Sequence, residues 1–422
     1  MSTSAILVLQ GGGALGAYEC GAYKALVPHL KEHDQDLKIV AGTSIGALNA
    51  SIIALNYGKE DHGAGTLESI WKSELAVSSL AFPYPIPVSE KSQRWNAVWT
   101  ILSNGHPRLF TPRLPGWQFL PSTFWSHFTH FYDTKAMERT VERHFKSAPC
   151  THDGSYGPRA AAPRLIITAV DIGEGRGTAF DSLKQSITSE HVVASGSIPP
   201  GFSAKTIEGK RYWDGGLWAN TPLRDVLYVL EEEGSDDGLL AEEADIYQRI
   251  YIVDVFPRRS PPPQTLWGVL SRMDEITYAD KTRYYAVWDL INRYARSAKR
   301  AHQYIELVPQ LYELSKALPP SKLKDLIEKE YKEHVKLSEE KELSKEREEY
   351  KKIHQKHFDL RIMRIERSPL PHEAISRDVD FSPERIEALI DQGYEDARET
   401  LKNESERDGT WNPLSSNSEV DV

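Results

Sequence analysis

The first 55 residues alternate between short apolar runs and helical segments, and this alternation constrains the fold more than any other feature. Residues 5–10 (AILVLQ) form an apolar run with the length of a buried strand, and residues 37–41 (LKIVA) form a second one. A glycine-rich turn and a helical segment follow each run. This order predicts the α/β fold class, a three-layer α/β/α sandwich with a mostly parallel sheet.

The length of 422 residues suffices for a large α/β domain and an appended region. We expect the core domain over residues 1–310, with a Pro- and aromatic-rich excursion or cap at 78–131. The stretch 311–403 is predicted to be a charged helical extension with an edge strand and a final helix. The polar residues 404–422 are predicted to be a disordered tail.

The composition excludes several classes of protein. A formal net charge of −10 argues against a nucleic-acid partner, which requires a basic face. The two cysteines, Cys20 and Cys150, make neither a disulfide framework nor a Cys-rich zinc site. The N-terminus lacks the features of a signal peptide, and no stretch approaches the roughly 20 apolar residues of a membrane-spanning helix. We therefore expect a cytoplasmic protein, and peripheral contact with a membrane surface is left open.

The pentapeptide GTSIG, residues 42–46, matches the pattern G-x-S-x-G between a predicted strand and a predicted helix. A nucleophilic serine needs a tight strand-to-helix turn with small neighbours, which Gly42 and Gly46 supply around Ser44. The amides at the start of the following helix, beginning with Ile45, point toward developing negative charge. The motif predicts Ser44 as a nucleophile.

The hexapeptide GGGALG, residues 11–16, follows the first predicted strand directly. Glycines allow backbone N–H groups to approach an anion, so Gly11, Gly12 and Gly13 are candidates for an oxyanion hole. With Gly16 the same residues also spell the dinucleotide fingerprint G-x-G-x-x-G. A dinucleotide site needs an acidic residue after the next strand, and here that position carries the GTSIG motif instead. The oxyanion hole is therefore the favoured interpretation.

The tripeptide DGG follows a short predicted strand at residues 211–213. Asp214 could reach Ser44 without obstruction from Gly215 or Gly216 and accept the hydroxyl proton. Taken alone, an aspartate that caps a Gly-Gly bend explains this pattern better.

In this order, the three motifs resemble those of the patatin-like phospholipase family, and the resemblance extends roughly from residue 5 to residue 256. It implies a patatin-like fold and a Ser44–Asp214 dyad that hydrolyses acyl esters of lipids, as a phospholipase A, lysophospholipase or neutral lipid esterase. It implies no metal and no cofactor, and a lipid or acyl-ester partner. Ala14 and Leu15 depart from the family pattern, in which many members carry Arg or Lys inside the glycine loop.

A catalytic triad would add a histidine after the aspartate. None of the candidates follows a strand in a tight glycine-rich loop, which favours the dyad; they are His302, His334, His354, His357 and His372. Two other classes of function remain open: a catalytically idle lipid-binding protein on the same fold, and a dinucleotide-binding oxidoreductase. The sequence leaves the oligomeric state undetermined.

Overall fold

The computed structural model describes residues 3–78, 90–113, 129–147, 155–157, 162–233, 247–257, 259–260, 262–263, 266–279, 311–316, 322–339, 359–368 and 378–408. The chain divides into two compact units. The first comprises Met1–Leu227, Ile246–Asp280 and Leu360–Val422, and the second comprises Tyr228–Asp245 and Lys281–Asp359. The boundary predicted at residue 310 stays a prediction; the predicted edge strand and final helix group with the first unit.

In the described part of the chain, the first unit is built on one eight-stranded sheet in the order β10-β9-β1-β2-β5-β8-β7, with β6 paired to β5. The pairs β1–β2, β1–β9 and β2–β5 are parallel, whereas β6 and β8 run antiparallel to β5, and β7 to β8. The strands are β1 (Thr3–Leu9), β2 (Gln35–Thr43), β5 (Arg164–Asp171), β6 (Arg176–Asp181), β7 (Lys205–Ile207), β8 (Lys210–Asp214), β9 (Tyr247–Asp254) and β10 (Asp359–Glu366).

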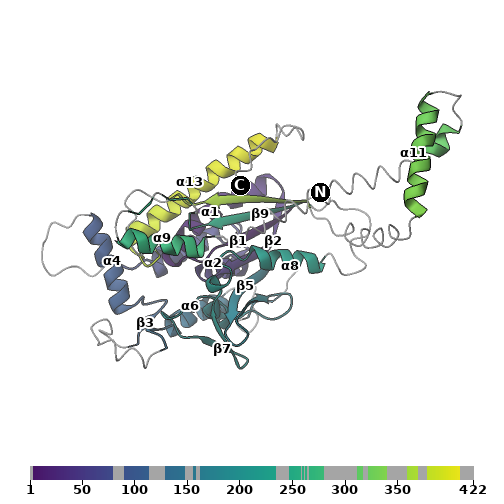
Figure 1. Ribbon diagram of the computed structural model, residues 1–422. Coiled ribbons are helices and arrows are strands. Elements are labelled where there is room, and N and C mark those ends of the chain that lie inside the picture. Colours follow the sequence, from purple (N-terminus) through teal and green to yellow (C-terminus); the bar gives the residue numbers. More distant parts are fainter. Residues whose placement is uncertain are drawn as a thin grey trace. The chain divides into compact units, whose positions relative to one another are not determined.

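The four parallel strands, β1, β2, β5 and β9, are rich in apolar residues because helices cover the sheet and leave most of their side chains buried. Leu7 and Leu9 on β1 and Ile250 and Val253 on β9 are fully inaccessible to solvent. Strands buried on both faces cannot alternate between polar and apolar residues. The predicted α/β class, with a mostly parallel sheet and flanking helices, is confirmed, and Figure 1 shows the strands at the centre of these helices.

The described helices belong to both units, with α11 in the second. They are α1 (Gly16–Glu32), α2 (Ile45–Asn56), α3 (Ala64–Ile70), α4 (Glu90–Asn104), α6 (Lys135–Ser147), α7 (Ser189–Ser195), α8 (Leu223–Glu233), α9 (Leu266–Tyr278), α11 (Lys322–Glu339) and α13 (Pro383–Asp408). A π-helical segment, Trp71–Leu75, continues α3, and a two-stranded ribbon pairs β3 (Thr111–Pro112) with β4 (Tyr132–Asp133).

Two parts of the excursion predicted at residues 78–131, namely 79–89 and 114–128, lie outside the described residues. Its described part contains helix α4. The sequence also suggests a helix from residue 132, but the chain is extended there, because the Tyr132 N–H donates to the Gly201 carbonyl at 2.8 Å. Helix α6 begins only at Lys135, whose N–H is accepted by the Asp133 side chain at 2.8 Å.

Helix α13 runs along α1 at very short range (Figure 1). Two glycines permit this approach. A Cβ on Gly21 would lie 1.9 Å from the Ile390 carbonyl oxygen, and a Cβ on Gly393 would lie 2.0 Å from that of Tyr18. Both distances are far inside van der Waals contact and involve backbone atoms that cannot rotate away. The C-terminal helix is therefore an integral part of the first unit.

We predict that Gly393→Ala lowers the free energy of unfolding by about 1–3 kcal/mol, because the added methyl group forces α1 and α13 apart. Gly58→Ala is the matched control, since a Cβ there meets nothing within 4 Å. The control should change stability by less than about 0.5 kcal/mol. Urea denaturation measures both, and equal stabilities of the two variants would contradict the close packing.

Candidate active site

Ser44 occupies a strained turn between β2 and α2. Its backbone angles are φ 55° and ψ −121°, a conformation that residues other than glycine rarely adopt. Gly42 and Gly46 make the turn possible: a Cβ on Gly42 would lie 2.2 Å from the Gly46 oxygen, and one on Gly46 would lie 2.6 Å from the Leu9 oxygen. The turn therefore matches the strand-to-helix arrangement predicted from the sequence, and it exposes Ser44 to a cavity.

Ser195 ties the strained turn to the sheet. The Ser44 N–H donates to the Ser195 hydroxyl at 2.8 Å, and that hydroxyl donates to the Thr168 carbonyl at 2.6 Å. Ser195 is fully buried at the end of α7, so the tether is shielded from water. Sequence reasoning missed this residue because its two partners are 151 and 27 residues away along the chain.

Asp214 ends β8 and faces the same cavity as Ser44. Its side chain accepts the Gly216 N–H at 2.7 Å. Burial raises the pKa of Asp214 to about 7, against the opposing effect of hydrogen bonds from the Ser44 side chain and the Gly216 amide. The structure thus brings Ser44 and Asp214 together, with a carboxyl group that exchanges its proton near neutral pH.

Gly215 has a packing role next to this carboxyl group. A Cβ on Gly215 would lie 2.3 Å from the Thr168 oxygen, so β8 could not come as close to β5 with any other residue there. Gly16 is similar, because its Cβ would lie 2.7 Å from Ile45 and 2.8 Å from Trp71. These two glycines shape the site from outside the cavity.

The glycine loop, residues 11–13, lines the cavity beside Ser44. The Gly11 N–H donates to the Asn220 carbonyl at 3.1 Å, so the prediction of Gly11 as an oxyanion donor does not fit this geometry. Among the described residues, the amides of Gly12, Gly13 and Ile45 have no hydrogen-bond acceptor. They are available to an oxygen atom bound at Ser44.

The C-terminal segment packs against the glycine loop. The Asp378 carbonyl accepts the Ala14 N–H at 2.7 Å, and a Cβ on Gly13 would lie 2.2 Å from that same oxygen. Gly13 also has a φ of 56°, which favours glycine for a second reason. This contact was not predictable from local sequence, because it joins residues more than 360 positions apart.

The side chains of Gln10 and Asn220 fix the position of the glycine loop by hydrogen bonds. The Gln10 Oε1 accepts the backbone N–H groups of Val255 and Phe256 at 2.7 and 3.0 Å. The Asn220 Nδ2 donates to the Gly11 carbonyl at 3.0 Å. Both side chains also donate to the carbonyl of Tyr278, the last residue of α9, at 3.2 and 2.9 Å. The loop, the end of β9 and α9 are thereby joined in one network.

A cavity of about 260 Å³ extends from Ser44 and Asp214. Its wall is largely apolar, and no Lys, Arg or His is among the described residues that line it. The apolar lining comes from α2, the region 102–110, α6, the loop after α7, the segment after β9 and the C-terminal segment: Leu48, Leu102, Leu109, Phe110, Met137, Ile198, Phe202, Phe256, Val379 and Phe381.

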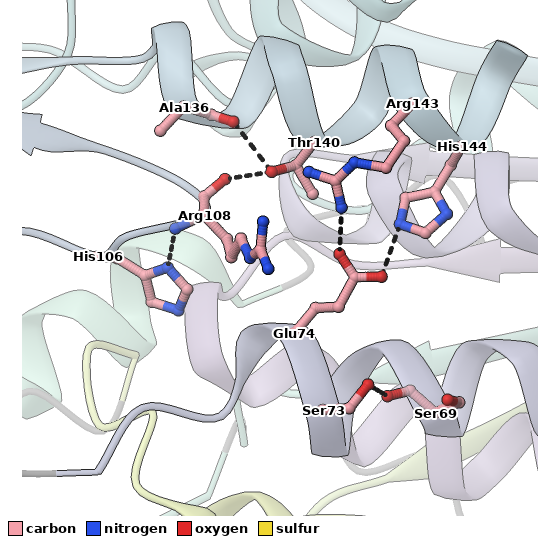
Figure 2. Close-up of polar contacts among 9 residues, drawn as sticks. All are labelled: Ser69, Ser73, Glu74, His106, Arg108, Ala136, Thr140, Arg143 and His144. Atoms are coloured by element: carbon pink, nitrogen blue, oxygen red, sulfur yellow. Dashed lines mark hydrogen bonds and ion pairs between the residues drawn. The ribbon is translucent and has the colours of Figure 1, made fainter.

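His106 supports the segment that carries Leu109 and Phe110 into the cavity wall, and Figure 2 shows its contact with Arg108. Its Nε2 contacts the Leu75 carbonyl at 2.9 Å, and its Nδ1 accepts the Arg108 N–H at 3.1 Å. Burial lowers the pKa of His106 to about 4, so the imidazole is neutral at physiological pH. The Thr140 hydroxyl of α6 donates to the Arg108 carbonyl at 2.9 Å. Leu109 and Phe110 are thus presented to the cavity by a fixed loop.

Glu74 joins α6 to the π-helical segment on the same side (Figure 2). It pairs with Arg143 at 2.9 Å and lies 3.2 Å from the Nε2 of His144. Burial lowers the pKa of His144, which favours its neutral form in this contact. The pairs brace the wall but do not reach the cavity lining.

No helix in the described ranges is long and apolar enough to cross a membrane. Within the same ranges, no group of three or more His, Cys, Asp or Glu side chains could hold a metal ion.

Comparisons with known proteins give two family matches. Residues 7–227 match the family model described as patatin-like phospholipase, and residues 321–410 match one described as patatin phospholipase. A search of curated proteins gives no match. Among solved structures, VipD from Legionella pneumophila is similar at 12% identity and a TM-score of 0.34, with 96% of this chain and 67% of VipD covered. The type III effector protein ExoU is similar at 12% identity and a TM-score of 0.27, with 95% and 53% covered, so this chain spans about half of ExoU.

We predict that Asp214→Asn stabilises the protein at pH 8. Between the ordinary pKa of 3.8 and the folded value of about 7, the folded state holds a proton that the unfolded chain has lost. Stability is therefore lost as the pH rises through this window, by up to about 4 kcal/mol. Asparagine stays neutral and can still accept the Gly216 N–H. Denaturation at pH 5 and pH 8 should show an advantage of the variant that grows with pH; a constant difference would contradict the raised pKa.

Proposed function

We propose, from the premise that this chain belongs to the patatin-like phospholipase family, that it hydrolyses carboxylic ester bonds of lipids through a Ser44–Asp214 dyad. Ser44 is the nucleophile and Asp214 is the base that accepts its proton. The observation that carries the proposal is the meeting of these two side chains at one end of an apolar cavity, with a pKa near 7 for Asp214.

The reaction begins when the Ser44 Oγ attacks the ester carbonyl carbon and its proton passes to Asp214. The carbonyl oxygen becomes negative and takes hydrogen bonds from the amides of Gly12, Gly13 and Ile45. One such donor typically lowers the activation free energy by about 3–4 kcal/mol. The C–O bond of the ester then breaks, the leaving alkoxide takes the proton from Asp214, and an acyl-enzyme remains.

A water molecule completes the cycle. Asp214 accepts a proton from this water as its oxygen attacks the acyl carbon, and the proton then passes to the departing Ser44 Oγ. The fatty acid leaves and both side chains return to their starting state. The lack of histidine among the described lining residues supports a dyad over a triad.

The apolar wall supports an acyl chain as the group that occupies the cavity. Ala14 and Leu15 stand where many family members carry a basic residue, and both are fully buried, so neither contacts a head group. These residues therefore specify only the acyl-ester part of the substrate, which is a phospholipid, a lysophospholipid or a neutral lipid.

We predict that Ser44→Ala and Asp214→Asn each reduce ester hydrolysis at least about 10³-fold, because each removes an obligatory partner in the proton transfer. Ser73→Ala changes an exposed serine in the π-helical segment and serves as the control. The assay is release of fatty acid from a micellar lysophospholipid, with circular dichroism as the check on folding. A fluorophosphonate probe should label the parent protein at Ser44. A folded Ser44→Ala variant with full activity would remove the proposal, and a parent protein without activity or labelling would favour the idle lipid-binding alternative.

We also predict that kcat/KM on an uncharged short-chain ester rises with pH around a midpoint of about 7. Asp214 accepts the Ser44 proton only in its ionised form, and its pKa of about 7 sets the fraction of active enzyme. Chromatographic measurement of the acid product from pH 5 to 9 avoids any dependence of the signal on pH. A rate that is constant over this range would show that a different group limits the reaction.

A further inference from the structure

Helix α9 contributes one face to the candidate active site. Ser271, Asp274 and Tyr278 are spaced three and four residues apart, which places them on one side of the helix, and all three line the cavity. The C-terminal end of the helix is held there, because the Tyr278 carbonyl accepts hydrogen bonds from Gln10 and Asn220.

The outer face of α9 is apolar and exposed. Val269 is 40% exposed, Leu270 43%, Met273 57% and Ile276 56%. On the inner side, Ser271 and Glu275 are only 8% and 2% exposed. A helix of a soluble domain normally buries its apolar stripe, whereas α9 exposes these four apolar side chains and buries Ser271 and Glu275.

This outer face is continuous with the side of the helix that lines the cavity. At about 100° per residue, the four apolar side chains cover an arc of about 120°, and the cavity-lining side chains begin about 40° beyond Leu270. A molecule that rests on the apolar arc is therefore adjacent to the residues that line the cavity.

The charges identify the kind of surface that fits. Helix α9 carries one base and two acids, and its base, Arg272, is paired with Glu275 at 2.7 Å. The whole chain has a net charge of −10. An anionic lipid surface would repel such a protein, whereas a zwitterionic surface offers apolar contact without an electrostatic penalty.

We propose that the outer face of α9 (Val269, Leu270, Met273 and Ile276) docks on the surface of zwitterionic phospholipid and so delivers ester substrate to the adjacent cavity. The proposal rests on the proposed function and adds the surface from which the enzyme draws its substrate. Large exposed apolar side chains that cluster on one helix are typical of binding surfaces, and amphipathic helices enter the lipid interface by their apolar face.

The test uses the full chain and vesicles of phosphatidylcholine in a flotation assay. The parent protein should float with the vesicles. The double variant Met273→Ser/Ile276→Ser should bind at least about tenfold more weakly, because two apolar contacts are lost. Leu183→Ser is the matched control, since Leu183 is an exposed leucine, at 51%, outside α9. The milder variant Met273→Gln should bind with intermediate strength, and thermal melting of each variant verifies that it is folded.

Measurements of enzymatic activity distinguish the docking proposal from the proposed Ser44–Asp214 dyad. The double variant should keep its rate on a soluble short-chain ester within about twofold and lose at least about fivefold on phosphatidylcholine vesicles. Ser44→Ala should lose both activities and still float. Vesicle binding by the parent with an active Ser44→Ala variant would overturn the dyad but leave the docking surface intact.

Four results would overturn the docking proposal. The parent protein could fail to float with phosphatidylcholine, or the double variant could bind as tightly as the parent. Binding that requires phosphatidylglycerol and is lost in high salt would show an anionic surface instead. A parent protein that forms dimers dissolved by the double substitution, without vesicle binding, would assign the apolar face to a second copy of the chain.

Discussion

The turn at Ser44 is the constraint on which the rest of the site depends. A serine with a φ of 55° is strained, and such strain persists only where the surroundings define the backbone completely. Here β2 and α2 meet without side chains at positions 42 and 46, and the Ser195 hydroxyl holds the Ser44 amide from the side. The same turn starts α2 at Ile45, which lines the cavity together with Ser44.

The C-terminal region has a direct part in this arrangement. Helix α13 packs on α1 through Gly21 and Gly393, and the segment before it places Asp378 on the glycine loop and Phe381 in the cavity wall. The Phe381 carbonyl also accepts the Val77 N–H at 2.8 Å. A segment that follows a charged region of low apolar content thus completes the cavity begun by the first 50 residues. This dependence couples the stability of the α1–α13 contact to the shape of the site.

Burial of Asp214 affects both the proton affinity of its carboxyl group and the stability of the protein. The same desolvation that raises its pKa to about 7 makes the ionised form costly in the folded protein. Helix α9 also departs from the arrangement that favours stability in water, because Met273 and Ile276 are exposed while Ser271 and Glu275 are buried. Asp214 lines the cavity and the apolar arc of α9 lies next to it, and proteins commonly accept such departures from optimal stability near functional sites.

The sequence alone determined the elements whose signal is local. Apolar runs specified the parallel strands, and glycines at fixed spacing around Ser44 specified the turn, because both follow from neighbouring residues. The family resemblance, which is confirmed over residues 7–227, led to the prediction that Ser44 and Asp214 form a pair although they are 170 positions apart. Only the tertiary structure decided that the Gly11 amide is already occupied by Asn220, that Ser195 and Gln10 are anchors, and that residue 132 is extended rather than helical. It also decided which face of α9 is buried. These outcomes depend on contacts between distant segments, and the periodicity of one segment carries no information about which partner covers it.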